Sequence, residues 1–155
     1  MHEAVFTRRA LFGLGLGIGL SALVMTNAGP AMANPVNTDN AGIAIDGHDP
    51  VAYFTMNKAL RGDKAITAEH GGATYHFVSQ EHRTLFVANP AKYVPQYGGY
   101  CAYGASQGYN APVEADKFTV VDGKLYLNYN GRVQSTWRKD TADYITQADA
   151  YWVTQ

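Results

Sequence analysis

Pro95-Gln-Tyr-Gly-Gly-Tyr-Cys-Ala-Tyr-Gly-Ala-Ser-Gln-Gly108 is the stretch around which the rest of the chain is organised. It contains four glycines, three tyrosines and Cys101, the only cysteine among the 155 residues. Glycine lets other backbone approach closely, and tyrosine has an apolar body whose hydroxyl needs a partner when it is buried. The stretch therefore predicts that the functional centre lies at Cys101 and at the residues that pack against it.

Residues 1–33 have the features of an export signal. Arg8-Arg9 precedes an apolar run from Leu11 to Met25, which is short for a membrane span. Ala31-Met-Ala33 offers a cleavage site before Asn34. The paired arginines favour the bacterial twin-arginine route, with a general secretory signal that happens to carry two arginines as the alternative. We therefore expect a periplasmic or secreted protein that is not an integral membrane protein once the signal is removed.

The composition of the chain after residue 33 excludes some classes of partner. Without Arg8, Arg9 and Glu3, the 12 basic and 13 acidic residues of the chain fall to 10 and 12. No run of lysine and arginine remains, so nucleic acid is not an expected partner. The length suits one domain, and no internal repeat is visible in the sequence.

Two glycine-containing turns predict two β-hairpins. Gly71-Gly72 separates candidate strands at 66–70 and 73–78, and Asp122-Gly123 separates candidate strands at 118–121 and 124–129. In the last strand, Leu125 and Leu127 point one way and Tyr126 points the other.

Helices are predicted by their capping residues. Ser79 and Asp140 are N-cap candidates for two helices, and a short helix is expected near residues 100–106. Val51–Phe54 has the pattern of a short extended piece. Residues 34–42 are polar and predict a flexible leader, so that the domain itself spans 43–155. The expected fold is a small α+β single domain of antiparallel β-hairpins packed with short helices.

Three motifs resemble the YHS domain family, in its exported, single-cysteine branch. They are Asp46-Gly-His-Asp-Pro-Val-Ala-Tyr-Phe54, Tyr75-His-Phe-Val-Ser79 with Phe86, Pro90 and Tyr93, and Tyr97-Gly-Gly-Tyr-Cys-Ala-Tyr103. The resemblance covers about Ile43 to the C-terminus. It implies the fold and a weakened expectation of metal binding.

The cysteine-rich branch of this family is associated with heavy-metal handling. Its cysteines would fall here on Ala52, Val78 and His82, of which only His82 can bind a metal. The resemblance therefore implies that the metal site of that branch is not carried over intact.

The residues themselves suggest a metal ion or a small ligand near Cys101. A Cys101 thiolate together with His48, His82 or His76 would suit copper or zinc by ligand type. Asp49 could serve as a further oxygen ligand or accept a histidine N–H. No two of these residues have a recognised ligand spacing, so the expectation rests on residue type alone. The alternative is that Cys101 is a buried, unreactive cysteine with a structural role only.

Two other functions stay open at this point. Cys101 and a histidine could form a thiolate–imidazolium pair in a thiol-dependent enzyme. The many tyrosines could instead form an aromatic protein-interaction module. We favour a non-enzymatic binding domain, since the sequence offers no orienting third residue and no oxyanion donors for an enzyme.

Overall fold

The computed structural model describes residues 34–155, which belong to one compact unit (Met32–Gln155). The predicted export signal, 1–33, lies outside the described residues. Among the helices from residue 34 onward, none has the length and apolar character needed to cross a membrane.

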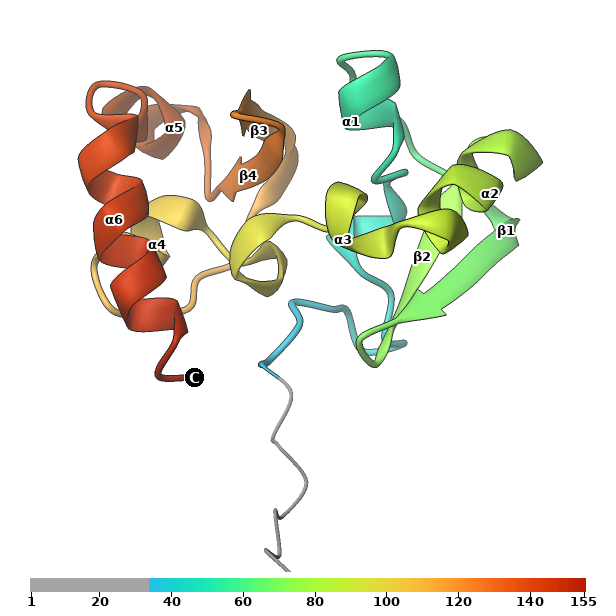
Figure 1. Cartoon of the computed structure of the whole chain (residues 1–155), viewed down its shortest axis with the longest axis horizontal. Coiled ribbons are helices and arrows are strands. Elements are labelled where there is room, and N and C mark those ends of the chain that lie inside the picture. Colours follow the sequence, from blue (N-terminus) through green and yellow to red (C-terminus); the bar gives the residue numbers. More distant parts are fainter. Residues whose placement is uncertain (1–33) are drawn as a thin grey trace, which may run out of the picture. The chain divides into compact units, whose positions relative to one another are not determined.

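The described part of the chain contains six α-helices and two antiparallel hairpins (Figure 1), which confirms the predicted α+β fold. In chain order, the elements are η1 (Ile45–Gly47), α1 (Ala52–Thr55), β1 (Asp63–His70), β2 (Ala73–Phe77), α2 (Gln80–Ala88), α3 (Pro90–Tyr93), η2 (Gln96–Gly99), α4 (Ala102–Ser106), β3 (Glu114–Val121), β4 (Lys124–Asn128), α5 (Gly131–Trp137) and α6 (Thr141–Trp152).

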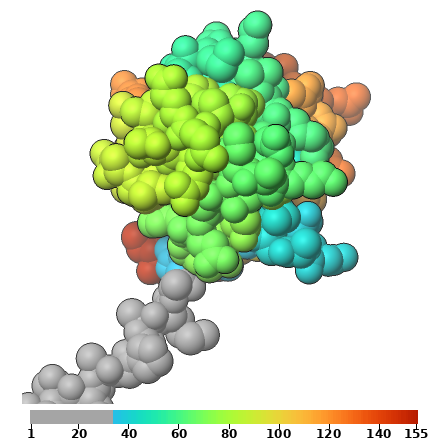
Figure 2. Space-filling view, turned by 90° about the vertical axis from the view of Figure 1, so that its right-hand side faces the viewer, coloured from blue at the N-terminus to red at the C-terminus, as the bar shows by residue number. Residues whose placement is uncertain are grey.

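The same succession of elements occurs twice. Residues 45–88, the first module, and residues 97–137, the second module, each begin with three consecutive residues at positive φ. In each module a short helix follows, then an eight-residue strand with an irregular register, a two-residue turn, a five-residue strand and a capped helix. Figure 2 shows one face of the first module, formed by β1 and α2. The repetition is one of structure, which the sequence alone did not reveal.

The two hairpin turns have the backbone that their sequences predict. Gly71 and Gly72 have φ values of 60° and 81°, and Asp122 and Gly123 have φ values of 50° and 73°. Positive φ at both central residues is the requirement of the two-residue turn whose twist matches the strands. Both hairpin predictions are confirmed.

The predicted helix caps are also confirmed. The Ser79 hydroxyl accepts the backbone N–H of His82 at the start of α2, and the Asp140 carboxylate accepts that of Asp143 at the start of α6. Each of these bonds satisfies one of the free N–H groups of the first turn.

The extended conformation predicted for Val51–Phe54 is wrong, because most of this segment belongs to α1. The cause is Asp49, whose Oδ1 accepts the backbone N–H groups of Val51 at 2.8 Å and Ala52 at 3.3 Å. A carboxylate that accepts these N–H groups bends the chain into a helical turn. Helix α5 was also not predicted; it is capped by Asn130, whose Oδ1 accepts the Val133 N–H.

Strand β4 contributes to both hydrophobic clusters of the core. Leu125 and Leu127 pack with aromatic residues of the first module, among them Phe77. Tyr126, on the opposite face, packs with Tyr97, Trp137 and Ala148 in a second cluster beside α5 and α6. The alternation predicted for this strand is confirmed, and β4 is buried on both faces.

Residues 34–42, predicted as a flexible leader, are attached to the rest of the domain. The Asn37 backbone N–H donates to the Gly98 carbonyl oxygen at 2.9 Å, and its side-chain amide donates to the Gly99 carbonyl oxygen at 3.1 Å. Val36 packs against the first hydrophobic cluster. The segment therefore forms part of the described structure rather than a separate tail.

Candidate functional site

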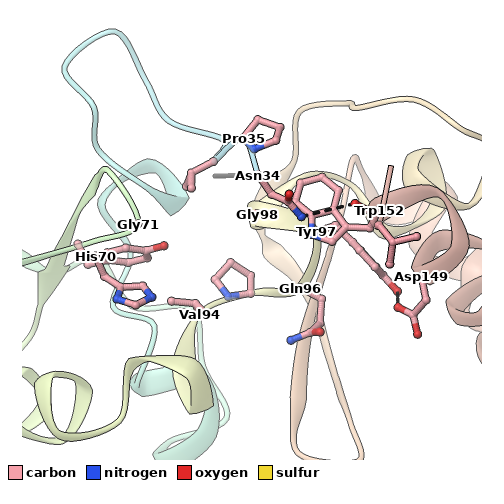
Figure 3. A pocket seen from close by; sticks show the side chains of 14 residues that line it. Asn34, Pro35, His70, Gly71, Val94, Gln96, Tyr97, Gly98, Asp149 and Trp152 are labelled. Atoms are coloured by element: carbon pink, nitrogen blue, oxygen red, sulfur yellow. Dashed lines mark hydrogen bonds between the residues drawn. The ribbon is translucent and has the colours of Figure 1, made fainter. Parts of the chain in front are cut away.

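A cleft of about 560 Å³ lies between the turn of the first hairpin and the C-terminal turn of α6. Figure 3 shows His70 and Gly71 on one side of this cleft and Asp149 and Trp152 on the other. The side chains that matter most for its chemistry are aromatic or polar: His70, Tyr75, Gln96, Tyr97, Asp149 and Trp152.

The floor of the cleft depends on an unusual backbone segment. Tyr97, Gly98 and Gly99 have φ values of 55°, 59° and 83°. Three consecutive left-handed residues are unfavourable, and a tyrosine in this region requires support from its surroundings. A Cβ on Gly98 would overlap with the carbonyl oxygen of Pro35 and would lie 3.2 Å from the Trp152 ring. Glycine is therefore required where the N-terminal segment and α6 meet.

Tyr97 joins the cleft floor to α6. Its hydroxyl donates a hydrogen bond to Asp149 Oδ1 at 2.9 Å, and its ring lies edge-on to Trp152 with centroids 6.1 Å apart. Burial, with a smaller contribution from the Asp149 hydrogen bond, raises the pKa of Tyr97 far above its ordinary value. The hydroxyl is thus a fixed donor, which holds the Asp149 carboxylate at the cleft.

Cys101 lies in a different place. It is 1% exposed, and its Sγ accepts the Gly104 N–H at 3.4 Å, so that it caps α4. The Asn128 amide approaches the sulfur at 4.0 Å, and the Oδ1 of Asn128 has no partner among residues 34–155. A small hollow of about 250 Å³ faces Cys101 and is lined by Tyr103, Tyr109 and Tyr129, with no histidine.

His82 is held by a buried carboxylate. Its Nδ1 lies 2.7 Å from Asp49 Oδ2, and Asp49 is completely buried. Its Nε2 lies 3.4 Å from the Thr55 hydroxyl oxygen at the surface. The expectation that Asp49 accepts a histidine N–H fits this arrangement.

His48 has its own local partner. Its Nδ1 lies 3.0 Å from the carbonyl oxygen of Ile45, within the turn that precedes Pro50. The structure therefore places Cys101, His82 and His48 in three separate hydrogen-bonded environments. None of the hydrogen bonds within residues 34–155 joins Cys101 to either histidine.

The fit of these residues to copper or zinc can be tested from their positions. Within residues 34–155, no three or more His, Cys, Asp or Glu side chains gather as a metal site would require. Copper or zinc binding by Cys101, His48 and His82 therefore stays a prediction without a preformed ligand set in this part of the chain.

Asp49 connects three segments of the first module. In this chain, Asp49 accepts the backbone N–H groups of Ala52 at 3.3 Å and Val78 at 2.8 Å, and it pairs with the His82 imidazole at 2.7 Å. One carboxylate thus joins the start of α1, the residue after β2 and the first turn of α2.

Sequence reasoning missed the cleft because its residues come from distant segments. Tyr97 belongs to the stretch that was singled out, but Asp149 and Trp152 lie far along the chain from it, in α6. One feature of the sequence could have pointed to the cleft. The last turn of α6 contains Asp149 and no basic residue. Helices favour the opposite charge at that end.

Comparisons with protein-family models, curated proteins and solved structures find no match in any of the three. The resemblance to YHS domains therefore rests on the quoted motifs.

Proposed function

We propose that this chain is an exported, non-enzymatic binding domain that takes a small organic ligand in the cleft between the first hairpin turn and α6. The observation that carries this proposal is the cleft itself, with its volume of about 560 Å³ and its aromatic walls. Small-molecule sites are typically concave spaces of roughly 300–1,000 Å³, mostly apolar and with a few polar groups.

The backbone at Tyr97 supports this choice. Left-handed conformations outside glycine are costly and tend to gather at ligand sites, where the surrounding structure maintains them. Tyr97 combines such a conformation with a buried ring and a hydroxyl directed to Asp149. The same conformation occurs at Ile45–Gly47 of the first module, outside the cleft, so it belongs to the repeated framework; the feature particular to Tyr97 is its contact with Asp149 and Trp152 at the cleft.

The metal and thiol hypotheses receive less support. Cys101 has the role of a helix cap and no histidine neighbour in its hollow. A thiol-dependent enzyme needs a base within hydrogen-bond reach of the sulfur.

A screen of small organic fragments by two-dimensional NMR tests the proposal. We expect ligands to shift the indole N–H signal of Trp152, which lines the cleft, and not that of Trp137, which is fully buried. The signals are assigned with Trp152→Phe. Trp152→Ala, in which binding is followed by the backbone N–H signals because the indole is gone, should abolish binding, and Gln96→Ala, a milder change in the cleft, should weaken it.

Tyr129→Ala is the matched control. Tyr129 is an exposed aromatic residue beside Cys101, away from the cleft. Ligand binding that is lost in Tyr129→Ala and kept in Trp152→Ala and Gln96→Ala would place the site at Cys101 and contradict the proposal. Thermal unfolding of each variant shows whether it is folded.

A further inference from the structure

The geometry points to a small organic cation, such as a quaternary ammonium compound, as the ligand class of this cleft. This inference rests on the proposed function and adds the charge of the ligand to it.

The charge of the cleft is negative. Asp149 contributes a carboxylate whose Oδ1 accepts the Tyr97 hydroxyl, and its Oδ2 has no hydrogen-bond partner among residues 34–155. Asp149 lies in the last turn of α6, where the helix dipole adds partial negative charge. A cation bound here would interact favourably with both.

Nothing within the described lining of the cleft neutralises this charge. The described lining includes no lysine or arginine, and His70 is the one basic side chain in it. An acidic residue at a helix C-terminus is locally unfavourable. Residues that break a local rule in this way often serve a site, since the cost needs compensation.

The aromatic side chains suit a cation with an apolar body. Trp152 and His70 provide the accessible aromatic surface of the cleft (Figure 3), whereas Tyr75 and Tyr97 line it with rings that are only 3% and 4% exposed. The faces of tyrosine and tryptophan attract cations within about 6 Å of the ring centroid, most strongly at tryptophan. The accessible indole of Trp152 beside one carboxylate favours an alkylated ammonium group over a strongly hydrated metal ion, which prefers several oxygen ligands.

A pair of isosteric probes separates charge from shape. Choline carries a quaternary ammonium group, and 3,3-dimethyl-1-butanol has the same shape without the charge. We expect choline to bind about 10-fold more tightly, as followed by the Trp152 indole N–H signal; a factor of ten corresponds to about 1.4 kcal/mol.

Asp149→Asn tests the carboxylate without removing the acceptor for the Tyr97 hydroxyl, because the asparagine oxygen can still accept that bond. In this variant choline should bind no more tightly than the alcohol. Asp143→Asn removes the same charge from the first turn of the same helix and should leave the preference intact.

Each outcome decides the inference. Equal affinity for the two probes in the unmodified protein would overturn the cation inference and leave the cleft as a small-molecule site. A preference for choline that persists in Asp149→Asn would overturn the role of the carboxylate. If neither probe shifts Trp152, the cation inference fails, and the fragment screen decides separately on the proposed function.

Discussion

At the scale of single residues, the cleft depends on the contact between Gly98 and Pro35. Gly98 has a left-handed backbone, and among the described glycines it is the one at which an added Cβ would come nearest to a backbone atom of another segment. The left-handed backbone disfavours a side chain at this position, and the contact with Pro35 leaves no room for one.

Gly98→Ala is expected to lower the free energy of unfolding by about 2–4 kcal/mol, because it adds steric overlap to left-handed strain. Gly108→Ala is the matched control: Gly108 has φ +82°, and a Cβ there would meet nothing within 4 Å. It should cost only about 1 kcal/mol. Urea unfolding measures both, and equal losses would show that the Pro35 contact has no energetic weight.

At the scale of elements, one buried carboxylate fixes the first module. Asp49 accepts the backbone N–H of Val51 just before α1 and that of Val78 just after β2. It also pairs with the imidazole of His82 in α2. It therefore determines how a helix, a hairpin end and a second helix meet. Cys101 occupies the corresponding place in the second module, before α4, and makes weaker bonds there.

Asp49→Asn is expected to lower the free energy of unfolding by about 2–4 kcal/mol. Whichever way the amide is turned, its NH₂ group faces a backbone N–H, of Val51 or of Val78, and that donor is left unsatisfied. Asp46→Asn makes the same chemical change at an exposed ion pair with Arg61 and should cost less than about 1 kcal/mol. A comparable loss in both variants would argue against the central role of Asp49.

The sequence predicted the elements better than it predicted the site. The turns at Gly71-Gly72 and Asp122-Gly123 and the caps at Ser79 and Asp140 are local signals, so they could be found from neighbouring residues. Helix α1 was missed because the capping effect of Asp49 competes with the β-forming character of Val51–Phe54. The cleft was missed because it joins Pro35, Tyr97 and Asp149, and contacts over such separations leave no local pattern.

At the scale of the whole molecule, buried tyrosines make the stability of the domain depend on pH. Burial raises the pKa of Tyr53, Tyr97 and Tyr126 above the ordinary value of 10.0, and it raises the pKa of Tyr75 to about 12. Above pH 10 the unfolded chain loses these protons while the folded protein keeps them. The unfolded state then binds fewer protons, and stability falls as the pH rises.

We expect the contribution of these four tyrosines to the free energy of unfolding to be constant up to about pH 10. Above that pH the free energy of unfolding should decrease. Tyr75→Phe should make the decrease less steep. Tyr109→Phe, which removes the hydroxyl of a half-exposed tyrosine, should leave it unchanged. Urea unfolding between pH 8 and 11.5 measures the slope, and a slope that is identical in all three proteins would contradict the assignment.

Export is tested on residues outside the described structure. Arg8→Lys together with Arg9→Lys should block translocation, since paired arginines are the feature that the twin-arginine route reads. The amount of mature protein outside the cytoplasm measures the effect. An unchanged amount would indicate the general secretory route.

The attachment of residues 34–37 to distant parts of the chain bears on when this protein can finish folding. In the orientation that pairs donors with acceptors, the Asn34 amide oxygen accepts the Trp152 indole N–H at 3.0 Å, across a separation of 118 residues. A nascent chain cannot make this contact until residue 152 has left the ribosome, and contacts of such long sequence separation form slowly. The cleft is therefore completed only after α6 has been synthesised and has packed against residues 34–37, and a translocase that threads an unfolded chain would receive a protein in which the cleft does not yet exist.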